Sequence, residues 1–160
     1  MIQVGDRLPA ANLKRLTADG IKDVAVADLT QGRKVVLFAV PGAFTPTCSE
    51  KHLPGFLRSA ADFRAKGVDT IACVAVNDPF VMSAWEKASA IDGQIELYSD
   101  GNAEFTKALG LDFDASAVGL GTRSKRYAMV VDDGVVRTLL VEDVPSQAEK
   151  SSAEAILATL

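Results

Sequence analysis

The sequence predicts one α/β domain over residues 1–160, with a central mixed β-sheet flanked by helices. Short, nearly continuous apolar runs alternate with amphipathic stretches, which is the pattern of parallel β-α-β units. Later in the chain, Asp132-Asp133-Gly134 separates two apolar runs and indicates an antiparallel hairpin. The chain has 160 residues and 48% hydrophobic content, enough to bury one core without disulfides or a structural metal.

The first part of the chain predicts a hairpin or extended arm and then a buried strand. Residues 1–30 contain short apolar pieces around the turn residues Asp19-Gly20. Lys34–Val40 is rich in β-branched residues and typical of a strand buried on both faces. Thr45-Pro46 then suits a helix start, and we expect this helix to continue to Lys66-Gly67 with a kink at Pro54.

The remaining elements predict a thioredoxin-like order. It consists of a β-α-β unit, a further helix, a hairpin and a closing helix, with an N-terminal extension and an insertion at about residues 92–125. Right-handed crossovers would place helices on both faces of the sheet. We expect strands at Thr70–Val76, Ile95–Tyr98, Arg126–Val131 and Val135–Val141, and helices at Pro79–Ile91, Ala103–Leu109 and Gln147–Leu160.

Charge and composition exclude several function classes. The net charge is −4 and no dense Lys/Arg cluster is present, which argues against nucleic acid or an anionic membrane as the main partner. The first residues lack a secretory pattern and no apolar run reaches membrane-spanning length, so we expect a cytoplasmic protein. Two cysteines and one histidine are too few for a disulfide framework or a metal site, and we expect no cofactor.

Cys48 is the candidate nucleophile. With Thr45 as the N-cap, Cys48 occupies the third helical position, where unpaired backbone N–H groups favour a thiolate. The loop leaves the carboxyl end of a central strand, where open α/β sheets bind ligands, so we expect Cys48 at the floor of a shallow pocket. The alternative is that Cys48 is a small packing residue.

The segment around Cys48 resembles the peroxiredoxins. The pattern Pro41-x-x-x-Thr45-x-x-Cys48 and the run Pro-Gly-Ala-Phe-Thr-Pro-Thr-Cys-Ser are similar to those of the type II (peroxiredoxin-five) group, of the glutathione- or glutaredoxin-dependent kind. Further similarity lies in the segments 52–56, 76–82 and 125–131. The resemblance implies an antioxidant thiol peroxidase, a homodimer, that reduces hydrogen peroxide and organic hydroperoxides, with peroxynitrite as a further substrate.

The resemblance also implies roles for individual residues. Cys48 would be the peroxidatic cysteine that becomes a sulfenic acid, Thr45 would hydrogen-bond the thiolate and peroxide oxygens, Pro41 would shield the pocket, and Arg126 would complete the site. These roles supply the thiolate and the donors that attack on an O–O bond needs. The pocket or the neighbouring subunit contact would be lined by Gly42, Phe44, Thr47 and Phe80.

Several alternatives stay open from the residues alone. Arg126 lies close to Arg123 and Lys125, so it could belong to a solvated basic edge. His52 is four residues after Cys48 and could form a Cys/His pair, as in a cysteine hydrolase or acyltransferase, although we favour a structural or orienting role. A non-catalytic redox sensor or holdase on the same fold is another candidate.

Cys73 raises the question of how the oxidised enzyme is recycled. It lies inside a strongly apolar strand, so we predict a buried, inert thiol. Plant type II enzymes carry a cysteine at the same spacing of 25 residues, which leaves a resolving role as an alternative. Animal members place a resolving cysteine in the region that here reads Gln147–Ser151, without cysteine. We therefore expect a one-cysteine cycle recycled by glutathione or glutaredoxin, with thioredoxin as a further candidate reductant.

Overall fold

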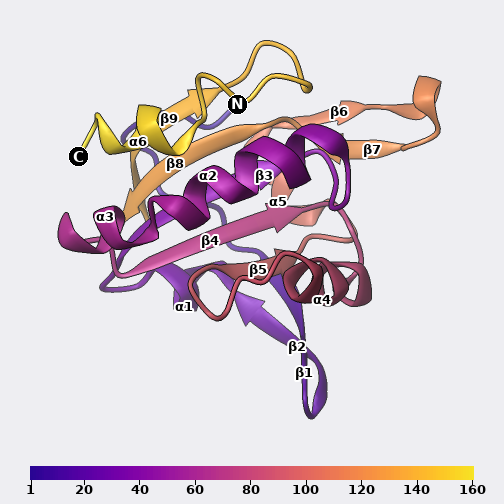
Figure 1. The fold of residues 1–160 in the computed structure, drawn as a ribbon, viewed down its shortest axis with the longest axis horizontal. Helices are drawn as coiled ribbons and strands as arrows, with labels where there is room; N and C mark the ends of the chain where they lie inside the picture. The colour runs from indigo at the N-terminus through magenta and orange to yellow at the C-terminus, as the bar shows by residue number, and fades with distance from the viewer.

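The computed structural model describes residues 1–160, and its seven-stranded sheet has the order β2-β1-β5-β4-β3-β8-β9 (Figure 1). The sheet strands are β1 (Asn12–Thr17), β2 (Gly20–Ala25), β3 (Lys34–Val40), β4 (Thr70–Ala75), β5 (Glu96–Ser99), β8 (Tyr127–Asp132) and β9 (Val135–Val141). A separate hairpin contains β6 (Asp112–Asp114) and β7 (Thr122–Ser124). The helices are α1 (Val26–Thr30), α2 (Leu53–Arg58), α3 (Ala60–Ala65), α4 (Pro79–Ala88), α5 (Glu104–Leu109) and α6 (Ala153–Leu157). A π-helical turn covers Cys48–His52 and a 3₁₀ turn covers Ser116–Val118. No helix has the length and apolar character needed to cross a membrane.

The predicted mixed sheet with helices on both faces is confirmed. Strands β3, β4 and β5 are parallel, whereas β8 is antiparallel to β3 and β9 to β8. Alternate residues of β3 enter two different cores, Phe38 with α2, α3, α4 and α6, and Leu37 with α1 and α5. Both faces of β3 are therefore buried, as its continuous apolar run predicted.

The strand register brings distant segments to one edge of the sheet. Because β8 is antiparallel to β3 and Tyr127 pairs with Ala39, Arg126 arrives beside the loop that follows β3. Val141, the last residue of β9, also pairs with Tyr127, so the C-terminal segment starts at the same edge. Asn77 follows the parallel strand β4 and reaches this edge as well.

Turn chemistry fixes this register. Asp133 and Gly134 have φ angles of 48° and 81°, as a two-residue hairpin turn of type I′ requires, and this confirms the predicted β8–β9 hairpin. The predicted N-terminal hairpin is also present, since β1 pairs with β2 up to Thr17 and Gly20, and Figure 1 shows it projecting from the sheet. The β6–β7 hairpin was not predicted, because three-residue strands are too short for a periodic signal.

The helix after the Cys48 loop is less regular than expected. We predicted one helix kinked at Pro54, but a π-helical turn, in which the Leu53 N–H donates to the Cys48 carbonyl, precedes that proline. Proline has no N–H to continue the regular ladder, which accounts for an irregular turn at this point. A second break at Ser59 separates α2 from α3.

The closing helix is shorter than the predicted Gln147–Leu160. Helix α6 begins at Ala153, where the Ser152 hydroxyl accepts from the Ala155 N–H at 3.1 Å. The residues before Ala153 are not helical, because side chains from a distant part of the chain hydrogen-bond their backbone groups. The Ser146 carbonyl accepts from Thr47 at 2.9 Å and the Ser151 carbonyl is bound by His52 at 2.8 Å.

The buried hydroxyl of Tyr127 provides a test of what stabilises this core. Tyr127 is fully buried, and its hydroxyl has no hydrogen-bond partner. Since an unpaired buried polar group costs free energy, Tyr127→Phe should leave the free energy of unfolding unchanged or raise it by up to about 1 kcal/mol. Trp85→Phe is the matched control and should lower it by about 1–2 kcal/mol, because the indole donates to the Ser49 hydroxyl at 3.0 Å. Urea unfolding measures both, and a clear loss of stability in Tyr127→Phe would show that the hydroxyl is paired.

Candidate active site

The loop that follows β3 is held by hydrogen bonds to its own backbone and to the neighbouring strand. The Ala43 N–H donates to Asn77 Oδ1 at 2.9 Å, and the Ser49 N–H donates to the Thr45 carbonyl at 2.9 Å, so the helical segment starts after Thr45 as predicted. The Thr45 hydroxyl donates to the Gly42 carbonyl at 2.7 Å. It makes no hydrogen bond to Cys48, because its only proton goes to the Gly42 carbonyl, and it accepts none from the helix-start N–H groups, so the expected cap is absent.

Cys48 is completely buried at the start of the π-helical turn. We expected the floor of a shallow pocket, but Cys48 lines none of five cavities on the molecule, although its neighbours His52 and Arg126 each line one. The Cys48 Sγ accepts one hydrogen bond, from Arg126 Nη2 at 2.9 Å. A guanidinium donor next to sulfur stabilises negative charge there, most strongly where water is excluded.

Arg126 is buried, with only 2% of its surface exposed. The alternative that Arg126 belongs to a solvated basic edge is therefore wrong. Its Nε donates to the Pro145 carbonyl at 3.0 Å, and its Nη1 contacts His52 Nδ1 at 3.0 Å. None of the salt bridges in the structure includes Arg126. Apart from the thiol of Cys48, its two other hydrogen-bond partners are neutral, and its positive charge is not compensated by a carboxylate.

His52 is a neutral imidazole placed between Arg126 and the C-terminal segment. Arginine can only donate, so Nδ1 must accept, and Nε2–H donates to the Ser151 carbonyl at 2.8 Å. Burial first, and the Arg126 charge second, lower the pKa of His52 to about 4. Both ring nitrogens are occupied away from Cys48, so the Cys/His pair of a hydrolase is not formed. The orienting role that we favoured fits this arrangement.

Glu142 anchors the far end of these contacts. Its carboxylate Oε2 accepts from the Ser151 N–H at 2.5 Å and from the Ser151 hydroxyl at 2.6 Å. Burial raises the pKa of Glu142, but the hydrogen bonds from Ser151 and from the backbone N–H groups of Lys150 and Glu149 together outweigh this effect, and the pKa is lowered. The Glu142 N–H donates to the Arg126 carbonyl at 2.9 Å. Glu142 therefore contacts both Ser151 and Arg126, the residue that binds the Cys48 sulfur. The sequence analysis identified neither Glu142 nor Ser151 as part of the site.

The predicted pocket residues divide into buried and exposed ones. Gly42 is buried, whereas Phe44 and Phe80 are 54% and 61% exposed. Phe44 has a φ of 62°, a left-handed conformation that costs energy for an aromatic residue and presents its ring at the surface. Thr47 is half-buried, and its hydroxyl bonds the C-terminal segment.

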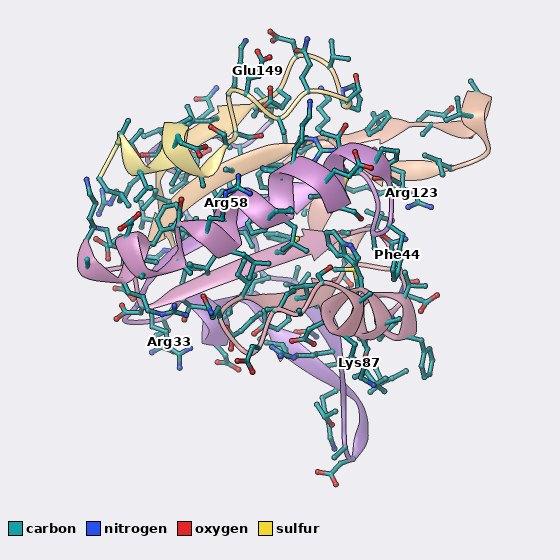
Figure 2. The ribbon with its side chains drawn as sticks, in the orientation of Figure 1. Arg33, Phe44, Arg58, Lys87, Arg123 and Glu149 are labelled. Carbon is teal, nitrogen blue, oxygen red and sulfur yellow. The ribbon has the colours of Figure 1, made fainter.

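Arg123 is a second basic residue at the loop. It lies on the same side of the molecule as Phe44 (Figure 2), and its Nη1 donates to the Pro41 carbonyl at 3.3 Å. A Cβ on Gly42 would lie 2.9 Å from this Nη1. Arg123 therefore braces the loop from β7, a contact that sequence reasoning read only as part of a basic edge.

Cys73 is buried in the same core as Cys48, as the apolar strand predicted. Burial first, and then the neighbouring Cys48, raise the pKa of Cys73 well above its ordinary value. The two cysteines are not bonded to each other. The structure has no group of three or more His, Cys, Asp or Glu side chains placed to hold a metal ion.

The pKa of His52 makes stability depend on pH. Between pH 6.5 and pH 4 the unfolded chain binds a proton at His52 and the folded chain does not, so stability falls as the pH falls. The Arg126 guanidinium and the Glu142 carboxylate are the charges that act on the ring. We expect a loss of about 3 kcal/mol across this window from His52 alone. Urea unfolding of wild type and His52→Asn between pH 7 and pH 4 checks this, and equal pH slopes for the two would contradict it.

Comparisons with known proteins agree with this arrangement. The redoxin family model matches residues 3–157. The chain is 56% identical over 164 residues to peroxiredoxin-2E-2 of Oryza sativa subsp. japonica, covering 99% of this chain and 72% of that protein. It is 52% identical over 163 residues to peroxiredoxin-2E of Arabidopsis thaliana, covering 99% of this chain and 69% of that protein. The crystal structure of reduced Prx3 in complex with H₂O₂ from Vibrio vulnificus superimposes with a TM-score of 0.94 at 55% identity, covering 99% of each chain.

The same comparisons correct one prediction and establish the family. Both plant relatives are named chloroplastic, which contradicts the predicted cytoplasmic location. That prediction rested on the missing secretory pattern, but an organelle address is a separate segment read by receptors and does not follow from the folded domain. The similarity extends over almost the whole chain and includes the loop that presents Cys48. This chain therefore belongs to the redoxin family and, within it, to the type II peroxiredoxins, and it is a thiol peroxidase.

Proposed function

We propose that Cys48 is the peroxidatic nucleophile and that Arg126 activates it. The hydrogen bond of 2.9 Å from Arg126 Nη2 to Cys48 Sγ is the observation that carries this proposal. The thiolate attacks one peroxide oxygen, the S–O bond forms as the O–O bond breaks, and the departing oxygen takes a proton to become water or an alcohol. Cys48 is left as a sulfenic acid, with sulfur oxidised and peroxide reduced.

The surrounding loop would orient the peroxide. The Thr45 hydroxyl donates a hydrogen bond to the Gly42 carbonyl, so its oxygen lone pairs remain free to accept a hydrogen bond from the peroxide O–H. Arg126 and backbone N–H groups at the helix start would donate to the oxygen that gains charge. Pro41, buried beside Gly42, would keep water out of this space. The roles of Gly42, Phe44, Thr47 and Phe80 as pocket residues belong to the same proposal.

The return half of the cycle would use an external thiol. Glutathione condenses with the sulfenic acid, releasing water and forming a mixed disulfide, and a second glutathione or a glutaredoxin thiol then displaces the Cys48 thiolate. The raised pKa of buried Cys73 supports this one-cysteine cycle, because a protonated thiol is a poor nucleophile. Thioredoxin is a second candidate reductant.

The proposal extends to substrates and assembly. The deep burial of Cys48 favours small substrates over bulky ones, so hydrogen peroxide and small organic hydroperoxides are the proposed substrates, with peroxynitrite as a further candidate. The exposed rings of Phe44 and Phe80 support a homodimer whose contact lies near the active-site loop. Both core clusters pack on one sheet, which supports one domain over residues 1–160.

The roles of Cys48 and Arg126 can be tested by substitution. Cys48→Ser should abolish peroxide consumption in a coupled assay with glutathione and glutaredoxin. Arg126→Met keeps the buried bulk but removes the donors, and should lower the rate constant for peroxide oxidation by about 10²–10³-fold. Lys125→Met, which removes the adjacent but exposed charge, is the matched control and should keep the wild-type rate. Turnover by Cys48→Ser would refute the assignment, and stoichiometric oxidation of the wild type without turnover would favour the redox sensor.

The fate of the sulfenic acid decides the role of Cys73. Mass spectrometry after one equivalent of peroxide should find sulfenic acid on Cys48, and a glutathione adduct on Cys48 when glutathione is added. Cys73→Ser should retain turnover with glutathione and glutaredoxin. A Cys48–Cys73 disulfide in the wild type, together with loss of turnover in Cys73→Ser, would instead assign Cys73 as the resolving thiol.

A further inference from the structure

The guanidinium of Arg126 is a buried cation whose partners include no carboxylate. Buried charges normally occur in ion pairs, because the cost of removing them from water is large. Here the hydrogen-bond acceptors are the Pro145 carbonyl, His52 Nδ1 and Cys48 Sγ. Of these, only sulfur can carry a negative charge. The charge of Arg126 is therefore left available to the Cys48 thiolate.

The imidazole of His52 supplies an acceptor without supplying an anion. Its Nδ1 accepts from Arg126 Nη1 at 3.0 Å, while Arg126 Nη2 donates to Cys48 at 2.9 Å, so the planar fork spans two side chains four residues apart on one helical segment. A carboxylate at position 52 would make an equally good hydrogen bond but would neutralise the guanidinium.

The orientation of the ring is fixed from the C-terminal segment. The Nε2–H donates to the Ser151 carbonyl at 2.8 Å, and Glu142 holds Ser151 through its N–H and its hydroxyl. The rings of Phe38 and Phe56 pack on the imidazole with centroid distances of 5.1 and 5.5 Å. The ring cannot turn without losing these contacts, and the tautomer that offers Nδ1 to Arg126 is therefore selected.

We propose that His52 is a positioning residue for the peroxidase reaction, a neutral imidazole, anchored by Ser151 and Glu142, that aims Arg126 at Cys48 while leaving the arginine charge uncompensated. The proposal rests on the proposed roles of Cys48 and Arg126. It makes the segment around Ser151, far from Cys48 in sequence, part of what maintains the reactive thiol.

Three substitutions of His52 separate its features. His52→Asn retains a neutral acceptor for Arg126 and should keep the rate constant for peroxide oxidation within about fivefold of wild type. His52→Leu removes the acceptor and should lower it by about 10- to 100-fold, the effect of displacing one aligned group. His52→Asp offers an anion and should be as slow as His52→Leu. Phe63→Leu, which removes a buried ring of the same core that stacks on Phe56 and not on His52, is the matched control and should react at the wild-type rate even though it is less stable.

The measurements are stopped-flow oxidation by hydrogen peroxide and the pH profile of Cys48 alkylation by iodoacetamide in the reduced, folded enzyme. A positioning role predicts that the alkylation midpoint moves to higher pH in His52→Leu and His52→Asp but not in Phe63→Leu. A purely structural role would lower the melting temperature of all three variants and move no midpoint.

A double-mutant cycle shows whether His52 acts through Arg126. In the Arg126→Met background, adding His52→Leu should change the rate constant less than twofold, because the group that His52 positions is already gone. Multiplicative losses, or a wild-type rate for His52→Leu alone, would overturn this inference and leave the proposed function intact. A wild-type rate for Arg126→Met would instead overturn the proposed roles, and the inference with them.

Discussion

The uncompensated charge of Arg126 is the constraint on which the rest of the site depends. A buried guanidinium without a carboxylate is tolerated only if several polar groups satisfy it, and the chain provides them from two separate segments. The C-terminal segment gives the Pro145 carbonyl, and the π-helical turn gives both His52 and Cys48. The cost of burying this charge is offset most fully when Cys48 is a thiolate. Protein stability and thiol reactivity are in this way linked through a single side chain.

The contacts that hold Arg126 also account for the irregular backbone before α6. Residues 147–152 have helix-forming composition, yet they stay non-helical, because the Ser151 carbonyl and N–H are bound by His52 and Glu142. A helix beginning at Gln147 would need those groups for its own ladder and would release the imidazole. The shortening of α6 to Ala153–Leu157 therefore follows from the same contacts that hold Arg126.

Local patterns predicted the elements whose signals lie within a few residues. The β-branched run of β3, the Asp133-Gly134 turn and the Thr45-Pro46 helix start each depend on short-range chemistry. That Arg126 joins Cys48 was implied by the family resemblance, and the pairing of β8 with β3 brings the two residues to one sheet edge. Contacts between segments far apart in sequence were not predictable in this way. The hydrogen bonds from Arg123 to the Pro41 carbonyl and from His52 to the Ser151 carbonyl join such segments, and no periodicity in the sequence indicates them. Thr45 was placed correctly at the helix start, but the partner of its hydroxyl depends on where the Gly42 carbonyl points.

The two cysteines show how far position, rather than residue type, decides chemistry. Both are fully buried in the same core cluster, so burial alone does not distinguish them. Cys48 has a cationic donor on its sulfur, whereas Cys73 sits on β4 opposite Phe38, and its pKa is raised by burial and by Cys48 itself. A negative charge on Cys48 makes a second charge on Cys73 more costly, so the Cys48 thiolate that we propose attacks peroxide would also hold Cys73 protonated. The arrangement thus separates the two thiols electrostatically, and the electrons that restore Cys48 are expected from outside the chain.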